Sequence, residues 1–131
     1  MAKEVIGANA IFSGPQKGLT IIGDHCYAYS GLKTANDTEA TLLEFDTGSR
    51  ILLIDARFTY GSANSDDVAY RIYMNDQIAI QDISGGTTQA HWFPQYKIII
   101  PPFTKVKFTA QNVSDASNIY QGAVISGKVY E

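Results

Sequence analysis

The sequence predicts an all-β protein: an eight-stranded antiparallel β-sandwich with jelly-roll topology and a short N-terminal extension. Apolar and polar residues alternate over short runs, which is the period of a strand with one buried face. No window of about twelve residues carries apolar positions at helical spacing without glycine, proline or strand formers in it. Eight tyrosines, six phenylalanines and eleven glycines also favour sheets joined by turns.

The expected strands begin at residue 25. HCYAYSGLK alternates and ends in the polar cluster TANDTE, and ATLLEFD leads through the turn TGSR into ILLIDARFTYG. Residues 51–54 of that last run are apolar on both sides, which is typical of a central strand buried on two faces. The eight strands are expected at about 25–33, 40–46, 50–61, 68–74, 77–83, 95–100, 103–112 and 119–130.

The run VAYRIYMNDQIAIQDI predicts a tight hairpin. Tyr70, Ile72 and Met74 share one face of the first strand, and the return strand alternates in the same way. Asn75 and Asp76 stand where a two-residue turn is needed, and both residue types tolerate the positive φ angles of that turn.

The double proline after YKIII predicts a corner between two strands. Neither Pro101 nor Pro102 can donate a hydrogen bond to a sheet, so the strand must end there. FTKVKFTAQN then alternates, with Val106, Phe108 and Ala110 on the expected core face. A corner of this kind suits a chain that crosses from one sheet to another.

Eight strands in roughly 105 residues, with one tight hairpin and several wider loops, suit two packed antiparallel sheets with frequent crossings between them. An immunoglobulin-like sandwich is the alternative, disfavoured because paired cysteines and a central tryptophan are absent. Residues 25–131 are therefore expected to form the jelly-roll sandwich. Residues 1–24, with short strands at 5–12 and 19–22, are expected to form an N-terminal strand or arm that pairs with an adjacent subunit's sheet edge.

Composition excludes several classes of partner. A chain of 131 residues with 45% apolar residues has room for one core, and its net charge of −3 with scattered cations argues against nucleic acid. No stretch approaches the roughly 20 apolar residues of a membrane span, and MAKEVIGANAIF lacks the apolar core of a signal peptide. We expect no membrane partner and a chain that is made and kept in the cytosol.

No catalytic residues are predicted. The single cysteine, Cys26, cannot form an internal disulfide and is expected to be a small buried hydrophobe. His25 precedes it on a strand, so their side chains point to opposite faces and cannot form a thiolate pair. His91 adjoins Trp92 in a loop, where loop packing is the simpler interpretation. A small sandwich enzyme is the weakest of the functional hypotheses.

No cofactor or metal is predicted either. Asp24-His25 and Asp66-Asp67 supply oxygen and nitrogen atoms, but their spacing matches no metal-binding loop. The Gly-Gly of SGGTTQ lacks the Lys-Ser/Thr ending of a phosphate-binding loop, so it is interpreted as a flexible turn.

Exposed aromatic residues are the remaining candidates for a site, because sugar faces stack on aromatic rings. The candidate residues for glycan or partner contact are Trp92, Phe93, Tyr96, Tyr60 and Tyr73. Self-association is the stronger hypothesis, since aromatic residues and methionine are enriched at interfaces. Tyr27 and Tyr29 share one face of their strand and flank Ala28, so one row is expected in the core while the other can meet a neighbour.

The series IPPFTKVKFTAQNVSDASNIYQ, with a last strand closing on SGKVYE, resembles the C-terminal half of small jelly-roll structural proteins of bacteriophages and related viruses. These include head-decoration and minor capsid proteins. TLLEFDTGSRILLIDARFTYG resembles their middle strands, and the resemblance covers roughly residues 25–131.

This resemblance implies a non-enzymatic capsid-decorating or minor capsid subunit. It would be made in the host cytoplasm and located in the virion, and its partners would be its own copies, as a trimer or pentamer, and capsid protein. The alternative is a carbohydrate-binding or host-attachment module of the same fold.

Overall fold

The computed structural model describes residues 3–6, 16–62, 66–84 and 95–131, and in this part of the chain every regular element is a β-strand. The strands are β1 (Lys3–Ile6), β2 (Gln16–Lys17), β3 (Leu19–Ile22), β4 (His25–Tyr29), β5 (Lys33–Ala35), β6 (Ala40–Asp46), β7 (Ile51–Ser62), β8 (Val68–Met74), β9 (Gln77–Ser84), β10 (Gln95–Ile100), β11 (Lys105–Asn112) and β12 (Ile119–Tyr130).

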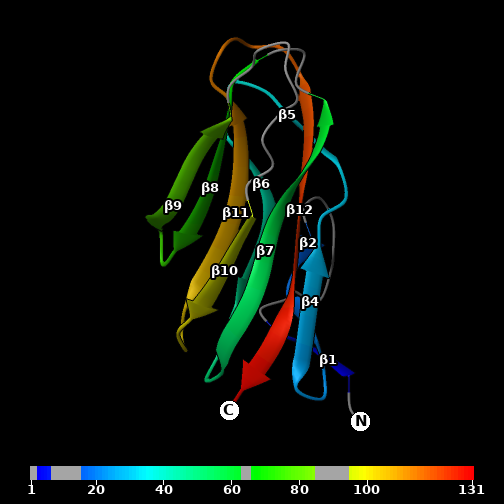
Figure 1. Ribbon diagram of the computed structural model, residues 1–131, viewed down its shortest axis with the longest axis vertical. Coiled ribbons are helices and arrows are strands. Elements are labelled where there is room, and N and C mark those ends of the chain that lie inside the picture. The colour runs from blue at the N-terminus through cyan, green and yellow to red at the C-terminus, as the bar shows by residue number, and fades with distance from the viewer. Residues whose placement is uncertain (1–2, 7–15, 63–65, 85–94) are drawn as a thin grey trace.

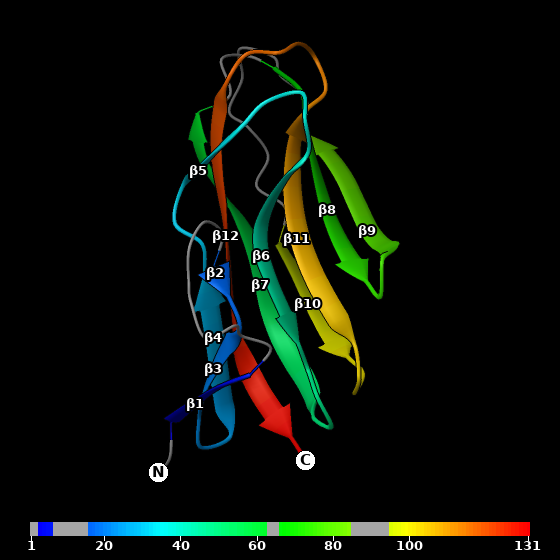
Figure 2. The same cartoon turned by 180° about the vertical axis from the view of Figure 1, so that it is seen from behind.

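The strands form two sheets that face each other (Figure 1). One sheet has seven strands in the order β1-β3-β4-β12-β7-β10, and β5 also pairs with β12. The other sheet has five strands in the order β2-β6-β11-β8-β9. All pairings are antiparallel except that of β2 with β6. Figure 2 shows the same two layers from behind.

The strand pairs are nested in the manner of a jelly roll. β8 pairs with β9 at the centre of the sequence, and β7 with β10, β6 with β11 and β4 with β12 surround that pair in turn. Successive pairs in this series alternate between the two sheets. This order confirms the predicted all-β sandwich of two sheets, although the described residues form twelve strands and not eight. The predicted strands 68–74, 95–100 and 119–130 coincide with β8, β10 and β12.

The core fills the space between the two sheets. Phe58 comes from the seven-stranded sheet, and its ring centroid lies 4.8 Å from that of Tyr70 and 5.6 Å from that of Phe108, both on the five-stranded sheet. The Tyr70 hydroxyl donates a 2.7 Å hydrogen bond to the buried Gln121 amide oxygen on β12, so the one polar atom of this cluster is paired. Aromatic contacts of this kind stabilise the stacking of the sheets.

The predicted hairpin and corner are both present. Asn75 and Asp76 have φ angles of 52° and 65°, which is the left-handed conformation that a type I′ turn requires at both positions. β10 lies in the seven-stranded sheet and β11 in the five-stranded sheet, so the chain crosses between them at Pro101-Pro102.

Thr47, in the turn between β6 and β7, holds this corner in place. Its buried hydroxyl donates to the Pro101 carbonyl at 2.9 Å and accepts from the Thr104 amide at 3.1 Å. The Phe103 amide donates to the Gly48 carbonyl at 2.6 Å, while Phe103 itself has a φ of 56°. The backbone groups that the prolines leave without strand partners are therefore satisfied by the neighbouring turn.

Three expected strands differ from those observed. The strand expected at 103–112 begins only at Lys105, because Phe103 has a φ of 56° and belongs to the corner. The run 25–33 is interrupted because Gly31 adopts a φ of +67°, so β4 ends at Tyr29, and β5 begins at the last residue of the predicted strand, Lys33, and runs into the predicted loop. The prediction that residues 51–54 are buried on both faces is wrong, although β7 is central as expected. Leu52 points into the core, but Ile51 is 40% exposed on the outer side, where no described element covers the sheet.

The described residues of the N-terminal segment pair with their own chain. β3 lies beside β4, β1 beside β3, and β2 beside β6. For residues 3–6 and 16–22 this differs from the expected arm on another subunit's sheet, because they extend the sandwich that follows them. The part of the expected strand 5–12 that starts at residue 7 lies outside the described residues, and the division of the chain at residue 24 stays a prediction.

Thr47→Val should destabilise the fold by about 1–3 kcal/mol, because it keeps the side-chain size but leaves the buried Thr104 amide without its acceptor. Urea unfolding followed by fluorescence measures the change. Thr47→Ser keeps the hydroxyl and is the matched control. A loss in Thr47→Ser with none in Thr47→Val would show that the methyl group, and not the hydrogen bonds, stabilises the corner.

Candidate functional site

The aromatic candidates predicted from the sequence do not form one group among the described residues. Trp92, Phe93 and the side chain of Tyr60 lie outside the described part. Tyr96 packs against the core from β10, and its hydroxyl donates to Asp82 at 2.9 Å. Burial and this carboxylate raise the pKa of Tyr96. Tyr73 lies instead on the outer side of β8, so a shared glycan platform for these two residues has no support, and their contact role stays a prediction.

The outer face of the five-stranded sheet carries a polar network around Glu39. The carboxylate accepts hydrogen bonds from the Tyr73 hydroxyl at 2.7 Å and from the Thr109 hydroxyl. Arg71 lies 3.4 Å from Glu39 and donates to Gln81 at 2.7 Å. These donors and acceptors satisfy one another, so the network stabilises the sheet surface and leaves no group poised as a base or nucleophile.

The network also sets the charge state of Glu39. Burial opposes ionisation, but hydrogen bonds from Thr109 and Tyr73 and the positive charge of Arg71 together lower the pKa of the Glu39 carboxyl from its ordinary value of 4.5. Burial and the same contact raise the pKa of the Tyr73 hydroxyl. The arrangement therefore favours a carboxylate beside a neutral phenol.

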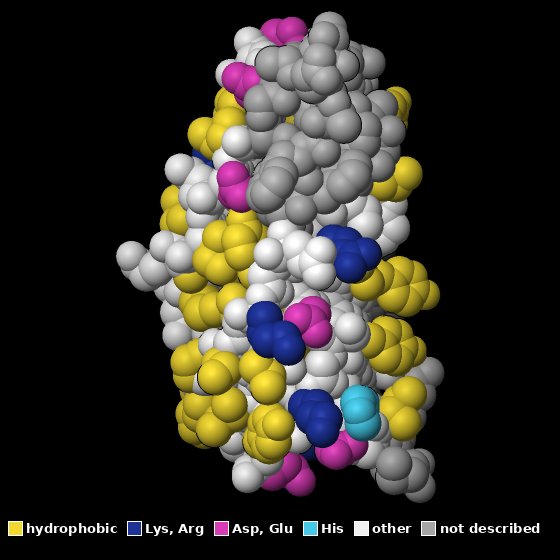
Figure 3. Space-filling view, viewed as in Figure 1, with side chains coloured by type: hydrophobic (Ala, Val, Ile, Leu, Met, Phe, Trp, Pro, Cys, Tyr) yellow, Lys and Arg dark blue, Asp and Glu magenta, His cyan; other side chains and the backbone are white. Residues whose placement is uncertain are grey.

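The outer face of the seven-stranded sheet is more apolar. Its exposed members stand on alternate positions, opposite the core residues of the same strands. Tyr29 is 59% exposed and lies opposite Val124, while Ile99 is 65% exposed and lies opposite Leu53. Tyr27 stacks beside Tyr29 with ring centroids 6.4 Å apart, as expected for the outward row of β4. Figure 3 shows apolar side chains gathered toward both sides of this face.

Charged residues occupy the middle of the same face (Figure 3). Lys97 and Asp55 lie opposite each other on β10 and β7, and Arg57 lies opposite Val124 of β12. A shallow hollow of about 210 Å³ opens here, lined by Asp55, Arg57, Gln95, Val124, Ile125 and Ser126. Both signs of charge are present, which suits contact with a surface of mixed charge rather than with a polyanion.

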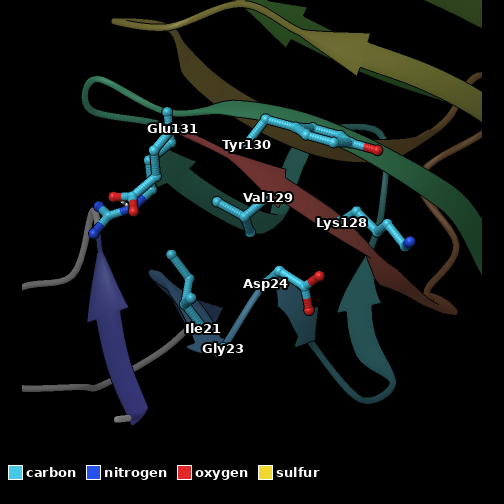
Figure 4. Close-up of a pocket in the computed structure, with 8 residues that line it drawn as sticks. Ile21, Gly23, Asp24, Lys128, Val129, Tyr130 and Glu131 are labelled. Carbon is cyan, nitrogen blue, oxygen red and sulfur yellow. Dashed lines mark ion pairs between the residues drawn. The ribbon is translucent and has the colours of Figure 1, made fainter. Parts of the chain in front are cut away.

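A larger hollow of about 490 Å³ lies at the end of the sandwich where β12 finishes (Figure 4). Its lining residues are Ile21, Gly23, Asp24, Arg50, Lys128, Val129, Tyr130 and Glu131. Arg50 forms a 3.6 Å ion pair with Glu131. Asp24 contacts His25 at 2.7 Å, but both side chains are largely exposed and no nucleophile adjoins them in the lining, so the arrangement is not that of a catalytic site.

Cys26 is buried on the core side of β4, as predicted. Burial outweighs a backbone hydrogen bond with Gly127 and raises the pKa of the thiol to about 11. The thiolate that nucleophilic chemistry needs is therefore disfavoured.

Asp66, considered above as a metal ligand, has a structural role in the described part of the chain. Its carboxylate accepts a 2.8 Å hydrogen bond from the buried Asn112 amide, which also donates to Asp115 and to the Ser117 carbonyl. Over the residues that the structure describes, no group of three or more His, Cys, Asp or Glu side chains is placed to hold a metal ion. The same residues include no helix with the length and apolarity that a membrane crossing requires.

Comparisons with known proteins show similarity of fold only. No protein-family model matches the chain, and no curated protein matches it. The VP2 subviral particle of infectious bursal disease virus is similar in structure, with a TM-score of 0.50 and 15% sequence identity over 94% of this chain. Two further structures, T=1 particles derived from the infectious bursal virus and the Gx strain of the virus, have TM-scores of 0.47 and 0.43, at 13% and 16% identity over 93% and 95% of this chain. The chain spans 36–37% of the length of these proteins.

Sequence reasoning missed the network around Glu39 and the outward row completed by Val124 and Ile99. Polar residues at alternate positions of β8 and β11 indicate a polar outer face, but they do not indicate that Glu39, from a loop, is their common partner. The outward apolar row depends on which strands become neighbours, and the alternation of residues within one strand does not specify its neighbours.

Glu39→Gln should change the pH dependence of stability. A lowered pKa in the folded state adds stability above about pH 4.5, and that contribution disappears as the pH falls through the folded-state pKa. The wild type should therefore be more stable than the variant near pH 7. This difference in unfolding free energy should shrink as the pH falls below about 4.5. Unfolding free energies measured from pH 7 to pH 3 test this, with the exposed Asp46→Asn as a control for loss of one carboxylate. A difference independent of pH would contradict it.

The Cys26 thiol should not react with a disulfide reagent at pH 8 while the protein is folded, because it is buried and its pKa is raised. In denaturant one thiol per chain should react, as the sequence contains one cysteine. Rapid labelling of the folded protein would show that this side chain is accessible.

Proposed function

We propose that this protein is a non-enzymatic structural subunit of a virus particle, a capsid-decorating or minor capsid protein that assembles as a symmetric trimer or pentamer. The observation that carries the proposal is the outer face of the seven-stranded sheet, where Tyr29 and Ile99 are more than half exposed on a rigid sandwich. The jelly-roll fold and its similarity to a protein of a virus particle support it.

Contact between copies would bury these apolar side chains. Removing apolar surface from water contributes about 25 cal/mol per Å², and tyrosine is enriched in the buried centres of interfaces. The charges between the apolar groups include Asp55 as well as Arg57 and Lys97, so two copies can meet without an excess of like charge. Closed symmetry is the usual result of such self-association.

A structural role also agrees with the chemistry of the described residues. The one cysteine is buried, and the acidic and aromatic groups near each other are hydrogen-bonded in stable networks. Capsid protein would be the second partner, and the virion the location, after synthesis in the host cytoplasm. Neither nucleic acid nor membrane binding is part of the proposal, because the surface charge has both signs.

The alternative is a carbohydrate-binding or host-attachment module. The observation that favours it is the hollow of about 210 Å³, in which Asp55, Arg57 and Gln95 can bond hydroxyl groups. The stacked pair Tyr27 and Tyr29 lies next to this hollow on β4, the strand that pairs with β12 at Val124. Aromatic rings beside such polar groups suit the faces of sugars.

Native mass spectrometry should show a closed oligomer whose mass does not change with protein concentration. The double variant Tyr29→Glu, Val124→Glu places two carboxylates in the contact and should raise the dissociation constant at least tenfold. Val113→Glu, at an exposed apolar residue away from this face, is the matched control and should keep the wild-type mass. A monomeric wild type, or an unchanged mass in the double variant, would contradict the proposal.

A glycan array followed by a fluorescence titration distinguishes the alternative. The structural role predicts no saturable response to any sugar. A saturable response that is lost in Arg57→Ala would establish the binding module instead.

A further inference from the structure

The two sheets have different edge strands on the side of the molecule where β9 and β10 lie. β9 forms the last described strand of the five-stranded sheet and β10 that of the seven-stranded sheet. In Figures 1 and 2, β9 lies at the side of the molecule with no described element beyond it. The outer edge of an end strand carries backbone groups that can pair with another strand.

β10 has features that block such pairing, whereas β9 lacks most of them. The exposed Lys97 lies within β10, and Pro101-Pro102 directly follow it. Charged side chains and prolines are the usual means of preventing edge-to-edge association. β9 reads QIAIQDIS, with no lysine, arginine or proline, and its Ile78 and Ile83 are each 52% exposed.

The second half of β9, from residue 80 onward, alternates regularly between the core side and the outer side of the sheet. The register with β8 shifts between Ile72 and Tyr73, which places an extra residue, Ala79, in β9. From residue 80 onward the pairing is regular, with Ile80 packed toward the core and the exposed Gln81 on the outer side. Asp82 is held by the Tyr96 hydroxyl at 2.9 Å, so its charge is engaged on the inner side.

We infer that the outer edge of β9 pairs antiparallel with β9 of a second copy, about a twofold axis at Gln81. Residues directly opposite each other in an antiparallel pair share a face of the sheet. An axis at Gln81 places inward Ile80 opposite inward Asp82, and outward Ile83 opposite the exposed Ala79. An axis at Asp82 would place two carboxylates opposite each other, which is unfavourable.

The inferred contact deepens the proposed function and rests on it, because it names a surface through which the subunits assemble. A strand that pairs with itself makes a twofold contact, which differs from the contact that closes a trimer or pentamer. The edge of β9 would therefore join two such oligomers, while the outer face of the seven-stranded sheet closes each one. The five-stranded sheets of the two copies would continue into one sheet of ten strands.

Gln81→Cys tests the position of the axis. A residue on the axis meets its own copy with Cα atoms about 4.5–5.5 Å apart, within the range for a disulfide. Mild oxidation should give a covalent dimer that a reductant reverses. Val113→Cys, exposed just after β11 and away from both proposed contacts, is the matched control and should stay uncrosslinked, as should the wild type with its buried Cys26.

Ile83→Lys tests the contact by assembly mass. A lysine on the edge should abolish the crosslink when combined with Gln81→Cys, and alone it should halve the native mass of the assembly. Circular dichroism checks that the variant is folded. An oligomeric wild type with no crosslink at Gln81 and no effect of Ile83→Lys would overturn this inference and leave the proposed function intact. A crosslinked dimer from a chain that forms no larger oligomer would support the β9 contact and overturn the trimer or pentamer.

Discussion

Burial of one face of each sheet against the other is the interaction on which the rest of this structure depends. Phe58 brings the centre of the seven-stranded sheet onto Tyr70 and Phe108 of the five-stranded sheet. Because the chain has no disulfide, this packing and the backbone hydrogen bonds hold the sandwich together. Tyr70 also bonds to Gln121 across the core, which fixes the two sheets in one relative position at little cost, since both polar atoms are paired.

The turns allow this burial by returning the chain to the correct sheet. Asn75 forms the turn of the β8–β9 hairpin and also exchanges hydrogen bonds with Lys105, so the hairpin is tied to β11. Thr47 performs the same task beside it, at the crossing where the double proline ends β10, through Pro101 and Thr104. In both places a polar residue in a turn bonds to backbone groups of a segment far away in the sequence. The nested strand order therefore depends on a few polar residues as well as on apolar alternation.

Alternation predicted most of the fold because burial on one face of a strand leaves a period of two in the sequence. The faces of β8, β11 and β12 follow from it, as do the hairpin and the corner. It could not predict that Ile51 and Leu53 stand on an open face, since an apolar run looks the same whether a partner covers it or not. Nor could it identify Gly127, where a Cβ atom would lie 2.1 Å from the Leu53 carbonyl oxygen, because that need arises only when β12 lies beside β7. The Glu39 network was missed for the same reason, as its members come from distant segments.

The outer faces of the two sheets and the edges of β9 and β10 differ in the residues that they expose. In the described part of the chain, many acidic and aromatic groups are hydrogen-bonded to one another, so the proposed contacts between copies depend on shape, apolar area and strand edges. The outer face of the five-stranded sheet carries the bonds of Glu39 and Arg71, with the exposed Ile83 at its β9 edge. The outer face of the other sheet carries the exposed Tyr29 and Ile99. Lys97 and the prolines protect the edge of β10, whereas β9 has isoleucines in the corresponding place. The proposed contact between copies at β9 would account for this asymmetry, because a protein that only had to remain monomeric would gain from protecting both edges.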